Sequence, residues 1–268
     1  MPAFEQGAVS LHYEISGDGP PLLLIAGMMS DSASWAPLVP RLEPHFTVIR
    51  PDNRTTGRTM PIDAPASVDL FAADCADLLS HLDPGPTHVM GHSLGGMIGM
   101  RLTCAHAGLV KSLTFAASAP IRLERNVALF RNLAAIRQSN AAPDVWLNAL
   151  FPWLFAPTFF ETEGAAEQAA MLSLAYPFAQ SAEAMLHQIA ALDGYVPDHI
   201  KNIPCPTQAL LAQGDLLLPA HLAKPSLGNI PVHTIADAGH SIHWDAPDAV
   251  AAHLIAFIAQ HEEDRHDN

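Results

Sequence analysis

The sequence has few charged residues. Of its 268 residues, 15% are Asp, Glu, Lys or Arg, whereas about 25% is usual for a soluble domain. Basic residues are the scarcer sign, with 13 Lys and Arg against 27 Asp and Glu, and none lies between residues 138 and 200. Binding to nucleic-acid phosphates or to an anionic membrane needs clustered Lys and Arg, so we expect neither partner. The 49% of hydrophobic residues can form a large core, which excludes intrinsic disorder as the main state.

Cysteine and long apolar runs are also scarce. The three cysteines, Cys75, Cys104 and Cys205, are widely spaced and form no Cys-x-x-Cys pair, so they fit neither a disulfide framework nor a zinc site. The early apolar run at residues 22–26 is far shorter than the ~20 residues of a membrane helix. The first residues lack the basic and apolar regions of a secretory signal. We therefore expect a cytoplasmic protein.

Strand and helix patterns alternate along much of the chain. Strand-like apolar runs occur at residues 8–16, 22–25, 47–49, 88–90, 113–115, 208–211 and 232–235. Helical patterns occur at residues 35–42, 70–82 and 94–107, and again from residue 245 onward. Strands that alternate with helices predict a parallel sheet with helices on both faces.

The alternation stops near Pro120 and resumes near residue 197. The segment between them has a helical composition that is broken by four prolines, Pro143, Pro152, Pro157 and Pro177. We therefore predict one α/β domain made of residues 1–119 and 197–268, with residues 120–196 inserted into it as a helical cap.

The motif with the clearest chemical meaning is Gly91-His92-Ser93-Leu94-Gly95. A bare Gly-x-Ser-x-Gly pattern is weak evidence because it can arise by chance. Here it stands directly between a predicted strand and a predicted helix, where a sharp turn would expose the serine hydroxyl and the helix N-terminus would offer free N–H groups. The position of the motif therefore makes Ser93 the candidate nucleophile.

A serine hydroxyl is a poor nucleophile near neutral pH, so it needs a general base that a carboxylate orients. His240, which follows the last predicted strand, is the candidate base, and Asp215, after the strand at residues 208–211, is the candidate acid. Asp237 competes as the acid, but it lies only three residues before the base. The other histidines considered, His92, His243 and His253, are weaker candidates for a direct role.

Together the strand, the Gly-His-Ser-Leu-Gly turn, the helix, Asp215 and His240 resemble the α/β-hydrolase superfamily. The resemblance is nearest to its small bacterial esterase, enol-lactonase and haloperoxidase-like branch. It implies a mostly parallel sheet of eight strands, with helices on both faces and the helical cap inserted after the sixth strand. It also implies an oxyanion hole formed by two backbone N–H groups, those of Met28 and Leu94.

The stretch from Pro51 to Thr59 is similar to the Asp-x-Arg-Gly-x-Gly-x-Ser turn of that branch. Thr55 stands where the turn usually has glycine, so an altered turn is expected. Arg54 is expected to hold the turn together rather than to take part in catalysis. No phosphate-binding loop or cluster of metal ligands is evident in the sequence, so we expect no cofactor and no metal.

The predicted cap is rich in aromatic residues, carrying ten of the 18 in the chain. Such rings can line an apolar pocket that excludes water, and Trp146, Trp153 and Phe155 are the candidate pocket residues. They could equally serve only to pack the cap onto the domain. Four arginines lie at the start of the cap: Arg122, Arg125, Arg131 and Arg137. They could receive a substrate carboxylate, although a solvated helix face is the simpler interpretation.

Three functions agree with these residues. The first is a serine hydrolase that cleaves a small, largely apolar carboxylic ester or lactone through an acyl-enzyme on Ser93. The second is hydrolysis of a C–C bond in a dicarbonyl ring-fission product, which the cap arginines would favour if the substrate is acidic. The third is a ligand-binding protein of the same fold with little turnover, but a pure binding protein has no need of an oriented base. The oligomeric state is not evident from the sequence.

Overall fold

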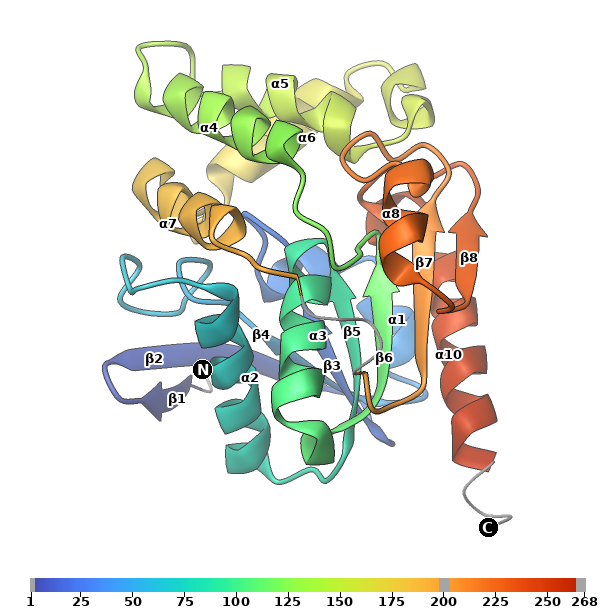
Figure 1. The fold of residues 1–268 in the computed structure, drawn as a ribbon. Helices are drawn as coiled ribbons and strands as arrows, with labels where there is room; N and C mark the ends of the chain where they lie inside the picture. Colours follow the sequence, from blue (N-terminus) through green and yellow to red (C-terminus); the bar gives the residue numbers. More distant parts are fainter. Residues whose placement is uncertain (1–2, 198–202, 264–268) are drawn as a thin grey trace.

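The computed structural model describes residues 3–197 and 203–263. Within them, eight strands form one sheet in the order β1-β2-β4-β3-β5-β6-β7-β8 (Figure 1). The strands are β1 (Ala3–Gln6), β2 (Val9–Ser16), β3 (Pro21–Ile25), β4 (Thr47–Pro51), β5 (Thr87–His92), β6 (Val110–Ala116), β7 (Thr207–Ala212) and β8 (Val232–Ile235). The pairs β1–β2 and β2–β4 are antiparallel, and every other neighbouring pair is parallel.

Helices cover both faces of the sheet. The helical elements outside the inserted segment are η1 (Ser32–Trp35), α1 (Val39–Leu42), α2 (Val68–Leu82), α3 (Leu94–Ala105), η2 (Ala107–Leu109), α8 (Ala220–Leu227), α9 (Ile242–Asp245) and α10 (Pro247–Glu263). Side chains of α2, α3 and α8 belong to one buried cluster, and side chains of α1 and α10 belong to another. The predicted layering is therefore confirmed.

The apolar run of β3 contributes side chains to both buried clusters. Leu23 and Ile25 belong to the cluster beneath α2 and α3, whereas Leu22 and Leu24 belong to the cluster beneath α1 and α10. Successive side chains of a strand point to opposite faces, so a strand covered on both sides must be apolar at every position.

The segment inserted between β6 and β7 forms α4 (Glu124–Gln138), α5 (Val145–Leu154), η3 (Pro157–Glu161), α6 (Ala165–Ala175) and α7 (Ala182–Asp193). Figure 1 shows these helices above the carboxyl ends of the parallel strands. Val127, Leu150 and Ile189, from three of them, are buried in the same cluster as α2 and α3. The cap therefore shares its core with the sheet.

Strand β1 was missed by the sequence analysis. It is a four-residue edge strand whose side chains alternate between exposed and half-buried, so it has almost no apolar pattern. The closing helix also differs slightly from expectation, because α9 ends at Asp245 and α10 begins at Pro247. Proline suits the first position of a helix because the N–H that it lacks would have no partner there.

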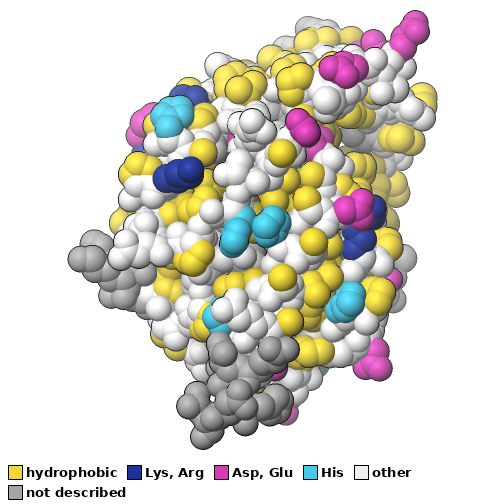
Figure 2. Space-filling model, turned by 90° about the vertical axis from the view of Figure 1, so that its right-hand side faces the viewer, with side chains coloured by type: hydrophobic (Ala, Val, Ile, Leu, Met, Phe, Trp, Pro, Cys, Tyr) yellow, Lys and Arg dark blue, Asp and Glu magenta, His cyan; other side chains and the backbone are white. Residues whose placement is uncertain are grey.

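Charge is sparse on the surface as well as in the sequence. Figure 2 shows Lys and Arg side chains isolated from one another among uncharged and apolar ones on the face that it displays. Within the described residues, no helix combines the length and the apolar character that crossing a bilayer requires.

Arg54, which we expected to hold the turn after β4 together, connects that turn to α2. Its guanidinium donates to Asp74 through two hydrogen bonds of 2.6 and 2.8 Å. The two side chains are only 10% and 3% exposed. Burial raises the pKa of Asp74 although the guanidinium beside it acts in the opposite direction, so the pair is held at a desolvation cost.

Replacing one member of this ion pair should therefore destabilise the protein more than replacing both. We expect Arg54→Met or Asp74→Leu alone to lower the free energy of unfolding by about 3–5 kcal/mol, because each leaves a buried charge without its partner. The double variant should recover most of that loss, and urea unfolding of the four proteins measures both effects. Losses that simply add in the double variant would contradict this account.

Candidate active site

Ser93 lies at the sharp turn between β5 and α3. Its backbone has φ 52° and ψ −118°, a strained conformation of the kind that costs about 1–3 kcal/mol and persists only where the surroundings impose it. The turn is tightly enclosed, because a Cβ added to Gly95 would lie 2.0 Å from the backbone oxygen of Ile25. The Ser93 N–H donates to the Ala116 carbonyl at 3.0 Å, and its own carbonyl accepts from Ser118 Oγ at 2.6 Å. The backbone on both sides of the serine is therefore fixed.

The three side chains expected to act together do meet. His240 Nε2 lies 2.8 Å from Ser93 Oγ, and His240 Nδ1 lies 2.8 Å from Asp215 Oδ2. The other carboxylate oxygen of Asp215 accepts from the Leu218 N–H at 2.7 Å. Asp215 is 3% exposed and His240 is 4% exposed, so water is largely excluded from the pair. Asp237, the competing acid, is exposed, and the carboxylate facing Nδ1 is that of Asp215.

Hydrogen bonds at the C-terminal end of α5, in the cap, hold the loop that carries His240. Asp245 Oδ2 accepts from the N–H groups of Gly239 at 2.8 Å and Ala156 at 2.9 Å. The Ser241 N–H donates to the Leu154 carbonyl at 2.8 Å. These bonds connect the segment from β8 to α9, which carries His240, to the cap.

Two further histidines lie behind this imidazole. The rings of His92 and His243 are 4.5 Å apart, and His92 Nε2 donates to the His240 carbonyl at 2.9 Å. Burial lowers the pKa of His92 to about 3 and holds the pKa of His243 well below its ordinary value. Both rings are therefore neutral near pH 7. His253 lies on α10, outside the cavity lining.

The loop after β3 passes directly beside the serine. A Cβ on Gly27 would lie 3.2 Å from Ser93 Cβ, so the small residue permits this approach. Met28 lines the same cavity as Ser93. Leu94 is the first residue of α3, where backbone N–H groups have no partner within the helix. Leu94 thus follows the serine directly, and Gly27, the residue before Met28, closely approaches it.

A glutamine of the cap fixes the conformation of that loop. Gln188, on α7, is 0% exposed, and its Oε1 accepts from the Met29 N–H at 2.8 Å. Met29 has a positive φ of 60°, an unusual conformation for a residue with a long side chain. The cap therefore supports the backbone immediately after Met28.

The turn after β4 keeps a glycine-like conformation although it contains threonine. Thr55 is fully buried and has a positive φ of 70°, which is a rare conformation for a β-branched residue. Gln180 of the cap donates from Nε2 to the Thr55 carbonyl at 2.8 Å. This cap contact stabilises the strained turn at Thr55.

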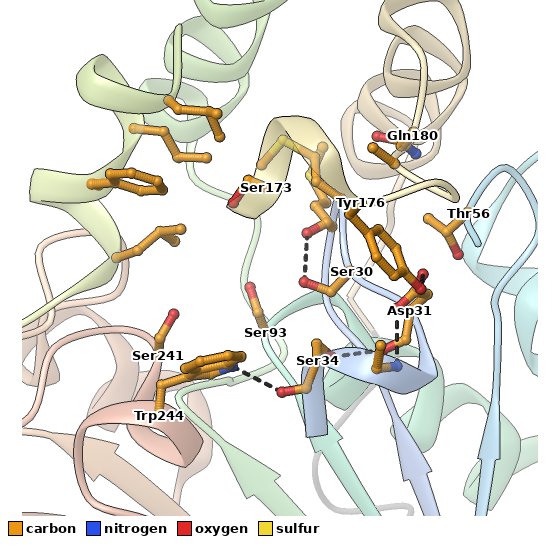
Figure 3. A pocket seen from close by; sticks show the side chains of 18 of the residues that line it. Ser30, Asp31, Ser34, Thr56, Ser93, Ser173, Tyr176, Gln180, Ser241 and Trp244 are labelled. Atoms are coloured by element: carbon orange, nitrogen blue, oxygen red, sulfur yellow. Dashed lines mark hydrogen bonds between the residues drawn. The ribbon is translucent and has the colours of Figure 1, made fainter. Parts of the chain in front are cut away.

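A cavity of about 380 Å³ lies between the cap and the sheet (Figure 3). Ser93 and His240 line it, as do Trp146 and Phe155. Its apolar wall also includes Phe130, Leu147, Leu150, Phe151, Leu154 and Leu172. Trp153, which we expected to line the pocket, does not. It packs against the main core instead, although it follows Trp146 by seven residues on the same side of α5.

Comparison with known proteins identifies the family. Residues 22–253 match the sequence model of the alpha/beta hydrolase family. The chain belongs to this family. It is 29% identical over 268 residues to the RutD protein of Azorhizobium caulinodans. The name of that protein provisionally describes it as a carbamate hydrolase. The match covers 97% of this chain and 99% of that protein.

Solved structures show the same fold. An enol-lactonase from Burkholderia xenovorans superposes on this hydrolase with a TM-score of 0.83 at 20% identity, covering 96% of this chain and 100% of that chain. A thermophilic esterase from Thermogutta terrifontis superposes with a TM-score of 0.81 at 21% identity, covering 94% of each chain. The predicted α/β-hydrolase fold is confirmed, and the chain is a hydrolase.

Three residues that hold the site of this hydrolase escaped the sequence analysis: Ser118, Gln188 and Asp245. None belongs to a motif, and each acts through a contact with a backbone far away in the sequence. Only the folded chain shows those contacts. Across residues 3–197 and 203–263, no group of three His, Cys, Asp or Glu side chains could hold a metal ion.

Two glycines of α3 allow a test of how tightly the serine turn is enclosed. We expect Gly95→Ala to lower the free energy of unfolding by about 3 kcal/mol and to abolish labelling of Ser93 by a fluorophosphonate, because the new Cβ meets backbone. Gly99→Ala is the matched control. Its Cβ would meet only side-chain atoms of Leu113 and Val89, at 3.0 and 3.2 Å, so stability should change by less than about 1.5 kcal/mol. Equal effects of Gly95→Ala and Gly99→Ala on thermal unfolding and on labelling of Ser93 would contradict the prediction.

Proposed function

We propose that the protein is a serine hydrolase that cleaves small, largely apolar carboxylic esters or lactones through an acyl-enzyme. The observation that supports this most strongly is the continuous hydrogen-bonded chain from Ser93 through His240 to Asp215, at the surface of an apolar cavity. Such a cavity favours uncharged substrate around the scissile bond and keeps bulk water away from it.

In the first half of the reaction, Ser93 Oγ attacks the acyl carbon while its proton passes to His240 Nε2. Asp215 keeps the Nδ1–H tautomer of the imidazole in place and stabilises the imidazolium that forms. The tetrahedral intermediate then collapses, and the imidazolium returns the proton to the departing alkoxide oxygen. The products of this half are the alcohol and an acyl-enzyme on Ser93.

The negative charge that develops on the carbonyl oxygen needs donors fixed in advance. We assign this role to the backbone N–H groups of Met28 and Leu94. The support that Gln188 gives to the Met29 N–H keeps the first of these donors from turning away.

In the second half, water attacks the acyl carbon while His240 accepts its proton, and Ser93 leaves with that proton. The imidazole thus becomes cationic once in each half-reaction. The neutral rings of His92 and His243 add no like charge beside it, because burial keeps the pKa of both low.

Carbamate hydrolysis is a second candidate, since the RutD relative is named for it. A carbamate presents the same kind of acyl carbon to the serine, so the same residues would serve. Turnover of esters, lactones, carbamates and a ring-fission diketone under identical conditions separates this candidate from ester and C–C bond hydrolysis.

The role of Ser93 is tested by replacing it. Ser93→Ala should reduce turnover on every cleaved substrate by roughly 10⁴-fold or more and should remove stoichiometric labelling by a fluorophosphonate, because no covalent intermediate can form. Ser226→Ala is the control, since this hydroxyl binds only the Ala223 carbonyl and lies outside the cavity lining. Retained turnover in Ser93→Ala would refute the acyl-enzyme. No labelling of the folded parent would favour the ligand-binding alternative.

The support from the cap is tested at Gln188. We expect Gln188→Leu to lower kcat about 10-fold with little change in KM, because the oxyanion exists only in the transition state. Gln188→Glu keeps an acceptor oxygen and should restore part of the rate. Gln168→Leu, at an exposed position of α6, should leave both constants unchanged. A rise in KM with unchanged kcat would show that Gln188 shapes the cavity rather than the oxyanion loop.

A further inference from the structure

The four arginines at the start of the cap have different surroundings. Arg122 pairs with Glu124 and Asp193, and Arg131 pairs with Asp193 as well. Arg125 donates to the carbonyls of two residues in the loop after β7, Leu216 and Leu217. Each of these three guanidinium groups therefore binds at least one local partner, although Arg122 Nε has none among the described residues.

Arg137 differs from the other three because it lines the cavity. It is half-buried in the last turn of α4, and its guanidinium carbon lies 4.2 Å from the ring centroid of Trp146. Its Nη2 donates to the Gln180 carbonyl, and its Nη1 lies 3.8 Å from Met185 Sδ. Among the described residues, no carboxylate lies within 4.0 Å, the distance of an ion pair.

The guanidinium is thus a partly desolvated charge without a counter-ion. Burial lowers the pKa of Arg137, and no neighbouring carboxylate opposes that shift, yet an arginine stays protonated at any physiological pH. The face of Trp146 and one carbonyl stabilise the cation, but several of its five N–H donors remain available.

The other charged residue in the lining, Asp31, does not serve as that counter-ion. Its carboxylate already accepts from the Tyr176 hydroxyl at 2.7 Å and from the Ala33 N–H at 2.9 Å. The remaining wall near the serine is mostly apolar. Arg137 is therefore the one Lys or Arg side chain among the residues that line the cavity, and a bound anion would relieve the cost of its burial.

Arg137 and Ser93 line the same cavity, so one bound molecule could contact both. Its Nη2 donates to Gln180, and Figure 3 shows Gln180 on the opposite side of Ser93 from Trp244. A molecule whose acyl carbon lies at Ser93 could therefore extend toward the guanidinium along the cavity.

We propose that Arg137 forms an anion-binding subsite and that the preferred substrates carry a carboxylate at the end of the acyl chain remote from the scissile bond. Half-esters of aliphatic dicarboxylic acids have this chemistry. The substrate part of the proposal rests on the proposed ester hydrolysis, whereas the binding of a dicarboxylate does not.

The kinetic test compares 4-nitrophenyl hydrogen adipate with 4-nitrophenyl hexanoate, in which a methyl group replaces the carboxylate. The parent should have a lower KM for the acidic ester. Arg137→Met should raise that KM roughly 10- to 100-fold and leave the hexanoate nearly unchanged, since a charge-assisted bidentate contact is lost. Arg137→Lys should retain part of the preference because it keeps the charge but not the planar pair of donors.

Arg131→Met is the matched control. Arg131 lies on the same helix, its side chain is 59% exposed, and it lies outside the cavity lining, so its loss should alter neither KM. Circular dichroism and thermal unfolding of Arg137→Met check independently that this variant is folded. Equal KM values for the two esters in the parent, unaffected by Arg137→Met, would overturn the subsite while leaving ester hydrolysis intact.

A binding test needs no turnover. Calorimetric titration of Ser93→Ala with adipate should show one site, and the Ser93→Ala/Arg137→Met variant should bind adipate at least 10-fold more weakly. Adipamide, which is uncharged, should bind both variants equally weakly. Binding of adipate through Arg137 in a protein that cleaves no ester would support the subsite and refute the proposed function. Failure of adipate to bind, or binding unchanged by Arg137→Met, would refute the subsite.

Discussion

The strained backbone of Ser93 is the constraint on which the candidate site depends. A residue with φ 52° and ψ −118° stays there only because β3, β6 and α3 surround it closely. The contact between Gly95 and the backbone of Ile25 leaves no room for a relaxed turn, and Ala116 and Ser118 hold the backbone of the serine itself. The close packing around the parallel sheet therefore also holds the Ser93 hydroxyl toward His240.

The cap does more than close the cavity. It contacts the loops on both sides of the serine through backbone hydrogen bonds: Gln188 holds the loop after β3, and the end of α5 binds the histidine loop directly and through Asp245. Gln180 supports the strained turn at Thr55 in the same way. A displacement of the cap would therefore disturb the loop after β3 and the histidine loop together. This arrangement couples the position of the cap to the backbone on both sides of the cavity.

The distribution of charge follows from the same arrangement. The site is built almost entirely from neutral groups, since two of its three clustered histidines are held uncharged by burial and the wall is apolar. In such surroundings a single charge has a strong influence, because little water screens it. Asp215 lies on one side of the serine, bonded to His240. Arg137, elsewhere in the lining, has a carbonyl and an aromatic ring beside it but no carboxylate among the described residues.

The sequence by itself determined the local features. Continuous apolar runs specified the buried strands, and the glycines around Ser93 marked the turn, because both depend on residues that are neighbours in the chain. The order of Ser93, Asp215 and His240 after successive strands was enough to identify the group of residues that meets. Only the tertiary structure decided which side chains support it. Gln188, Asp245 and Ser118 act across long sequence separations. Trp153 packs against the main core whereas Trp146 lines the cavity, and four similar arginines differ in what lies beside them. Such distinctions depend on contacts between distant segments, which no local pattern records.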